Sequence, residues 1–392
     1  MSYNEKRAYK NPDVVFRGDL IELIEAMKDE LPPIKLRNIA KKLNDTEDYV
    51  RRRIRKLGDY GLGFRTNFDL RKIGLSTLVV IFEEPLVLDA VTRIRGLDKN
   101  ISYILRWHGN INLPKPMGIA LFYIPYKMEV KEDLILMLKR SDIPRIVGAF
   151  ETDISKYDNL DLKKGATISG VDKRWKSLTE QLNENALSEK SFLEKNNYYI
   201  DIQRHVDLID LIILAKLQND SLTSMSEIAK LLGVSVGKVN RHLRTHIISQ
   251  NLIEGNSLKR KTQSLGEPSN IFLIIKGKAE QLYLLRETME VLSKQWEFLS
   301  ALYNSNTGEY LVLLLVKAGD MEKIDRYLHK LFGEILGTEY FIGIVNKSTI
   351  KSYTIPFISY NREERGWDLD QQLMDIMRQK FVEILAKGPG TH

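Results

Sequence analysis

At 392 residues the chain is too long for one ordinary hydrophobic core, so we expect roughly two to four domains. Its composition, 43% hydrophobic and 28% charged, is typical of a globular protein, and its net charge of +7 permits a polyanionic partner without requiring one. The absence of cysteine excludes a disulfide scaffold, thiolate catalysis and cysteine-ligated metal centres.

Nothing in the sequence predicts a membrane partner. The longest apolar run, Tyr310–Val316, is far shorter than the ~20 residues of a membrane-spanning helix. The N-terminal stretch, Met1–Asp13, lacks the apolar core of a signal peptide. We therefore expect a cytoplasmic protein.

Residues 14–70 predict a winged helix-turn-helix. An apolar-periodic helix starting at Asp19 precedes a second helix that contains Ile39 and Ala40. Asn44 can adopt the left-handed backbone of a tight turn, and Thr46 is the expected N-cap of a third helix.

The third helix has a basic outward face. Its ~100° step per residue buries Val50, Ile54 and Leu57. The opposite face carries the candidate DNA contacts Tyr49, Arg52, Arg55 and Lys56. Asp48, four residues before Arg52, lies in range of an ion pair within the helix.

Residues 71–165 change to short apolar runs that predict a βαββαβ order, as in ferredoxin-like domains. The expected elements are strand 75–83, helix 87–97, strands 101–107 and 117–124, helix 130–140 and strand 145–152.

The whole series recurs after a helical linker at 166–205, with Ile39 and Ala40 aligned on Ile228 and Ala229. A second winged helix-turn-helix is expected at 206–264, a second βαββαβ domain at 265–350 and a helical tail at 351–392. The second domain's expected elements are strand 270–276, helix 279–295, strands 297–304 and 309–316, helix 320–336 and strand 339–346. Trp175 and Trp367 each open a helical stretch in this interpretation.

The second helix-turn-helix follows the usual pattern more closely. Gly233 suits the turn and Ser235 the N-cap, and the buried face is Val239, Leu243 and Ile247. The candidate DNA contacts are Ser235, Gly237, Lys238, Arg241 and Arg244, with Lys259, Arg260 and Lys261 at the position of a wing. The alternative is a solvated basic face, but here no acidic residue accompanies the three cations of the helix.

Strands such as 77–82 and 310–316 are apolar on both faces, which predicts burial on both. The fold class is therefore α+β, with two tandem units whose sheets stack as an intramolecular pseudo-dimer. The alternative is that the C-terminal helices cover the open faces.

These parts resemble the Lrp/AsnC family of transcription regulators. The resemblance rests on residues 206–245, on residues 63–82 and on Thr307-Gly308-Glu309-Tyr310, which looks like the family's T-G-x-Y turn. It implies double-stranded DNA as partner, a fused dimer, and a small-molecule effector near Thr307, Gly308 and Tyr310. The first half has a longer loop, 107–118, in place of this turn, which argues against an amino-acid effector.

Other functions have weaker support. Residues 233–239 lack the spacing of a phosphate loop, and His242 and His246, four apart, are interpreted as packing residues rather than metal ligands. No catalytic residue, metal or cofactor is predicted. Siroheme decarboxylases resemble this family, and Arg106 and His108 would lie at their site. A third class is a protein-binding adaptor of the transcription machinery.

The hypothesis is thus a DNA-binding regulator with two non-identical heads that reads an asymmetric or pseudo-palindromic site. An apolar stripe at 369–384 could pair whole chains as a homodimer or belong to the core.

Overall fold

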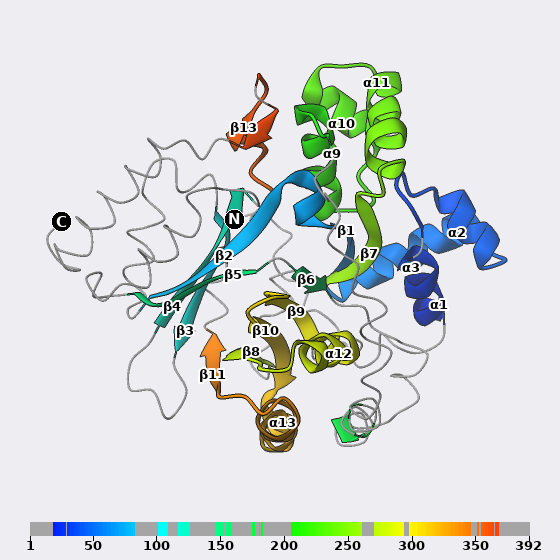
Figure 1. Ribbon diagram of the computed structural model, residues 1–392. Coiled ribbons are helices and arrows are strands. Elements are labelled where there is room, and N and C mark those ends of the chain that lie inside the picture. The colour runs from blue at the N-terminus through cyan, green and yellow to red at the C-terminus, as the bar shows by residue number, and fades with distance from the viewer. Residues whose placement is uncertain are drawn as a thin grey trace, which may run out of the picture.

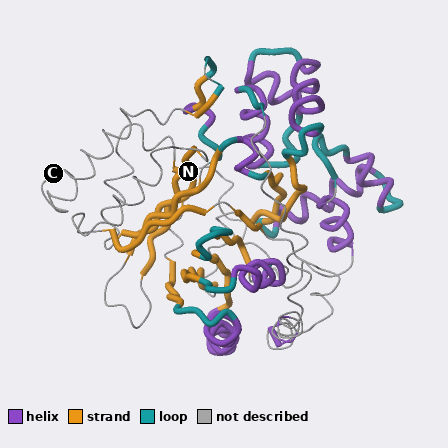
Figure 2. Tube along the Cα trace, in the orientation of Figure 1, coloured by secondary structure: helices purple, strands orange, loops and turns teal. Residues whose placement is uncertain are grey.

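The computed structural model describes residues 19–28, 30–82, 101–108, 117–125, 146–152, 154–157, 175–176, 180, 182, 205–260, 270–293, 298–345, 351–352, 354–363 and 365–367. Within these ranges the protein is a mixed α+β structure, as its sequence predicts. Figure 1 shows two helical groups beside a large sheet, and Figure 2 separates helices from strands by colour. None of the described helices is both long enough and apolar enough to cross a bilayer.

The two helical groups have the same order of elements. The first contains α1 (Asp19–Lys28), α2 (Leu36–Lys42), α3 (Glu47–Asp59) and strand β1 (Leu62–Phe68), and the second contains α9 (Leu208–Asn219), α10 (Met225–Leu232), α11 (Val236–His242) and strand β7 (Ile253–Arg260). The third helix of the second group does not stay regular, because after His242 it continues as a π-helix, η3 (Leu243–Ile248). A 3-10 turn, η2 (Leu70–Ile73), follows β1.

Strands β1 and β7 pair with each other and lie between the two groups (Figure 1). Leu258 of β7 is part of the first group's core, and Phe68 of β1 is part of the second group's core. The side chain of Asn256 donates to the carbonyls of Met27 and Glu30 at 3.0 and 2.6 Å. Each strand therefore completes the other group, and the two groups are held together by their cores.

The remaining strands form one large antiparallel sheet. They are β2 (Leu75–Phe82), β3 (Ile101–His108), β4 (Met117–Pro125), β5 (Ile146–Thr152), β6 (Ile154–Tyr157), β8 (Asn270–Lys278), β9 (Phe298–Tyr303), β10 (Glu309–Lys317), β11 (Tyr340–Val345) and β12 (Lys351–Ser352). The order runs β5-β2-β4-β3-β11-β8-β10-β9-β6, with β12 beside β3. In the first half, β2 thus lies between β5 and β4. In the second half, β8 lies in the same way between β11 and β10.

The inner faces of the two halves pack together. Leu311 and Leu313 of β10 share a core cluster with Val79, Ile81 and Leu121 of the first half. The alternate β10 residues face the second half's own helices, which are α12 (Leu282–Leu292), the 3-10 turn η5 (Ala318–Asp320), α13 (Met321–Leu328) and the π-helix η6 (His329–Ile335). Both faces of β10 are therefore buried, as its continuous apolar pattern predicts, and strands of the first half of the sheet cover the inner face.

The described part of the tail differs from the predicted helix. Residues 354–363 and 365–367 contain a 3-10 turn, η8 (Phe357–Ser359), and two short strands, β13 (Tyr360–Asn361) and β14 (Gly366–Trp367). Tyr360 packs in the core of the second helical group, and Trp367 lies in β14 and donates its indole N–H to the carbonyl of Ile73. The helices expected at 87–97 and 130–140, and the part of the expected helical tail from residue 368 on, which carries the apolar stripe, fall outside the described residues. Trp175 is helical and buried, stacked on Tyr327.

Candidate nucleic-acid interface

The turn between α10 and α11 is built from local hydrogen bonds. Ser224 and Glu227 form a reciprocal capping box at the start of α10. Gly233 ends that helix in the left-handed conformation at φ 64°, where a glycine avoids strain. The hydroxyl of Ser235 then accepts the N–H of Lys238 at 3.2 Å and caps α11.

The helix from α11 into η3 has one buried face and one basic face. Val239, Leu243 and Ile247 are fully buried in the core of the group. The opposite side exposes Ser235, Gly237, Lys238, Arg241 and Arg244. Within the described part of the chain, none of the three cations has a carboxylate within ion-pair distance, so all three are available to an anionic ligand.

Helix α3 presents a different face. Thr46 caps it by accepting the N–H of Tyr49 at 3.3 Å, and Asn44 takes the left-handed turn at φ 51°, as predicted. Its exposed cations are Arg51, Arg52, Arg55 and Lys56, of which the last three are the predicted DNA contacts. Tyr49 is half-buried, and the Arg52 guanidinium lies 5.4 Å from its ring centre.

The structure corrects the expected ion pair of Asp48 and places Arg53 on the buried side of the helix. Asp48 pairs with Arg51 at 3.9 Å rather than with Arg52, an exposed contact that contributes little. Arg53 is only 7% exposed, and it pairs with Asp45 at 3.3 Å and covers the Tyr49 ring. Asp45 aligns with the apolar Val234 of the other group, and the buried arginine compensates for this change.

The wing position is only partly described. Lys259 lies in β7, and its ammonium donates to the carbonyl and the side-chain oxygen of Asn219 at 3.0 and 2.8 Å. It is thus engaged with the end of α9. The side chain of Arg260, and Lys261 as a whole, fall outside the described residues.

The Thr307-Gly308-Glu309-Tyr310 turn is shaped by its backbone. The side-chain oxygen of Asn304 accepts the N–H of Thr307, and Gly308 adopts φ 74° where an added Cβ would lie 2.1 Å from the carbonyl of Ala279. Tyr310 is fully buried, bonds Thr338 at 3.0 Å and stacks on Phe332. Burial raises the pKa of its hydroxyl. These contacts make Tyr310 a core residue, while Thr307 is exposed.

Arg106 and His108, the residues considered for tetrapyrrole chemistry, lie on β3. Their side chains are outside the described set, so the chemistry at this position stays a sequence-based hypothesis.

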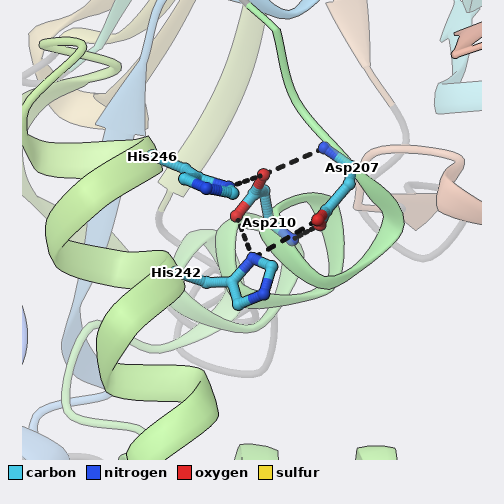
Figure 3. A group of neighbouring side chains, drawn as sticks. All are labelled: Asp207, Asp210, His242 and His246. Carbon is cyan, nitrogen blue, oxygen red and sulfur yellow. Dashed lines mark hydrogen bonds and ion pairs between the residues drawn. The ribbon is translucent and has the colours of Figure 1, made fainter.

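One cluster was missed by the sequence analysis. His242 and His246 do have acidic partners, because α9 brings Asp207 and Asp210 against them (Figure 3). Asp210 is fully buried, and its two carboxylate oxygens lie 3.0 Å from the Nδ1 atoms of the two histidines. Burial raises the pKa of Asp210, against the hydrogen bonds that it accepts. No local sequence signal indicates this cluster, because its acids and its histidines come from different helices, which are brought together when the first and third helices of the group pack.

Comparison with known proteins agrees with this geometry. Residues 206–245 match a family model described as winged helix-turn-helix DNA-binding. The HTH-type transcriptional regulator LrpA of Pyrococcus abyssi is 30% identical over 132 residues, which are 34% of this chain and 89% of that protein. LrpA of Pyrococcus horikoshii is 28% identical over 132 residues, which are again 34% of this chain and 89% of that protein.

A solved structure resembles nearly the whole chain. The siroheme decarboxylase NirDL, in complex with an iron-uroporphyrin III analogue, aligns with a TM-score of 0.51 over 92% of this chain and 99% of that one. The identity is 10%, so the likeness concerns the fold.

Proposed function

The chain belongs to the Lrp/AsnC family of transcription regulators, and on this basis we propose that it binds DNA sequence-specifically through two non-identical helix-turn-helix heads. The observation that carries the proposal is the exposed face of α11 and η3. Lys238, Arg241 and Arg244 point to solvent without acidic partners among the described residues, while the opposite face is fully buried. An arginine that contacts guanine in the major groove contributes about 1 to 3 kcal/mol of discrimination.

The second head in this proposal is α3. Its order of elements, its capped start and its left-handed turn match those of the α9–α11 group. Nearly the whole length of a relative, 89%, fits in 34% of this chain, which leaves room for a second unit. The two faces differ, since α3 offers Tyr49, Arg52, Arg55 and Lys56 where α11 and η3 together offer a glycine, a lysine and two arginines.

Two unlike faces favour an asymmetric operator. Identical heads related by a two-fold axis read a palindrome, whereas heads with different side chains prefer different half-sites. The β1–β7 pair joins the groups directly, so we expect a fixed spacing between the half-sites.

Selection from random DNA sequences tests this proposal. The purified chain is compared with Arg241→Ala/Arg244→Ala and with Arg52→Ala/Arg55→Ala, and each pair is expected to erase the preference at one half-site. Lys323→Ala/Arg326→Ala removes two exposed cations from α13 and serves as the matched control. If neither head variant changes the selected sequence, the two-headed mode is wrong, and a perfect palindrome bound by one chain would refute the asymmetry.

The fold shared with the siroheme decarboxylase supplies one alternative. A titration of siroheme with the protein tests it directly, because binding in a pocket changes the absorption spectrum of the tetrapyrrole. A protein-binding adaptor is the other alternative, and filter binding at rising salt separates it from a DNA-binding protein. Phosphate contacts make DNA affinity fall steeply as the salt concentration rises.

A further inference from the structure

We propose that Asp207, Asp210, His242 and His246 bind a divalent transition-metal ion of the Zn²⁺ type, which joins the first helix of the second helical group to its third (Figure 3). The proposal concerns a metal site and goes beyond the DNA-binding function. Only the expected effect of metal binding on DNA affinity rests on the proposed DNA-binding function.

The geometry is close to that of a four-coordinate site. One donor atom from each of the four residues lies within 4.8 Å of all the others. Tetrahedral ligands at zinc distances are separated by about 3.4 Å. The Nδ1 atom of His242 is 3.4 Å from Oδ2 of Asp207 and 3.0 Å from Oδ1 of Asp210, so small side-chain rotations would seat an ion.

The donor atoms remain available while the helix is capped. Oδ1 of Asp207 accepts the N–H of Asp210 at 3.0 Å and forms the N-cap of α9. Its other oxygen faces His242. Capping and coordination can therefore proceed on different atoms of one carboxylate. The C-terminal segment supports the approach to this cap, since Tyr360 donates its hydroxyl to the carbonyl of Val206.

The negative charges of the cluster also favour the binding of a cation. It holds two carboxylates, one of them fully buried, and within the described ranges Asp210 pairs with no lysine or arginine. Buried carboxylates are stable when paired with cations or bound to metals. A divalent ion would offset both charges, and imidazole nitrogen with carboxylate oxygen is a donor set that Zn²⁺ accepts.

The backbone at this point is unusual. His242 is the last residue of α11, and His246 lies in the π-helix η3. Single π turns within α-helices are frequent at functional sites. Here both rings lie on the same side of the helix, 4.7 Å apart and tilted by 69°, and both turn Nδ1 toward Asp210.

Among its described residues, the first helical group has no equivalent cluster. In the alignment of the two groups, Arg53 and Leu57 of α3 stand where α11 and η3 have the two histidines. In that group the positive charge is provided by a side chain, because the guanidinium of Arg53 is buried and pairs with Asp45. The site is thus specific to the second group, and the first provides an internal control.

An ion could enter from solvent. The side chains of Asp207 and His246 are 46% and 40% exposed, whereas His242 and Asp210 lie beneath them. Because η3 continues from α11, a bound ion would fix the exposed basic face against α9. We therefore expect metal binding to raise DNA affinity, and chelation to lower it.

Titration of the full chain with Co²⁺ tests the site, since tetrahedral Co²⁺ has strong visible absorption bands and the chain has no cysteine to compete. We expect one ion per chain, displaced by Zn²⁺. Asp207→Asn removes a ligand but keeps an N-cap residue, and His246→Gln changes a half-exposed side chain. Each should weaken Co²⁺ binding at least about tenfold. His329→Gln, an exposed histidine on η6, is the matched control.

Circular dichroism establishes that each variant is folded before titration. The proposal is overturned if the folded wild-type chain binds neither Co²⁺ nor Zn²⁺, or if both ligand variants bind them as tightly as the wild type. The two proposals fail independently, because Arg241→Ala/Arg244→Ala should lose the preference at one half-site and retain the Co²⁺ spectrum.

Discussion

Three consecutive arginines in α3 should behave in three different ways when substituted. Arg53 is 7% exposed and pairs with Asp45 at 3.3 Å, so Asp45→Val would leave a buried guanidinium without this carboxylate. Removing one partner of a buried ion pair costs about 3 to 5 kcal/mol. The Asp45 side chain is 23% exposed and the Tyr49 ring still covers the arginine, so we expect about 2 to 3 kcal/mol.

Replacing both partners should restore most of this loss. In Asp45→Val/Arg53→Met, apolar side chains fill a space in which neither charge remains, and such exchanges are close to neutral. The double-mutant cycle should therefore give a coupling free energy of about 2 kcal/mol. Arg51→Ala is the control, since its contact with Asp48 is exposed and should contribute less than about 1 kcal/mol.

Hydrogen exchange of the α3 amides under native conditions measures this local stability. DNA selection on the same variants completes the comparison, because Arg52→Ala should change the bound sequence while leaving the exchange rates nearly unchanged. A coupling free energy below about 0.5 kcal/mol would show that Asp45 and Arg53 do not act as a pair and would refute the reasoning.

Two further predictions concern the turns and the pH dependence of stability. Gly308→Ala should destabilise the chain far more than Gly233→Ala, as measured by urea unfolding. Both glycines have positive φ, but an added Cβ is 2.1 Å from a carbonyl at Gly308 and meets nothing at Gly233, where about 1 to 2 kcal/mol is expected. Equal losses would contradict this. Burial raises the pKa of Glu30, but Asn38 and Lys42 outweigh it and hold the pKa below its ordinary 4.5. The contribution of ionised Glu30 to the free energy of unfolding is thus fully present above pH 4.5. It is lost as the pH falls through the lower pKa of the folded state. Glu30→Gln should reduce this acid dependence in unfolding measured from pH 6 to about pH 3, and an unchanged profile would argue against the effect.

The features that depend on neighbouring residues were predictable from the sequence. The N-caps at Thr46 and Ser235 and the left-handed turns at Asn44 and Gly233 were predicted from residue type and position. The buried face of α11 follows from the helical step alone. Such signals lie within one or two turns of chain, where sequence patterns are most informative.

The features that depend on tertiary contacts were not predictable from the sequence. The partners of His242 and His246 lie on another helix, and the sequence around the histidines shows no acid. The burial of Arg53 was not predicted, because it depends on the ion pair with Asp45 in the preceding turn. The exchange of β1 and β7 between the groups joins residues about half the chain apart and has no local signature.

The β1–β7 pair has a consequence for synthesis of the protein. Arg65 and Ser257 are bonded partners separated by 192 residues. At about 5 to 20 residues per second, the ribosome needs roughly 10 to 40 s to make the second strand after the first. During that interval Phe64 and Leu62 have no partner strand to cover them. The N-terminal part of the chain is therefore expected to need protection from aggregation until β7, which ends at Arg260 of the 392 residues, has been made.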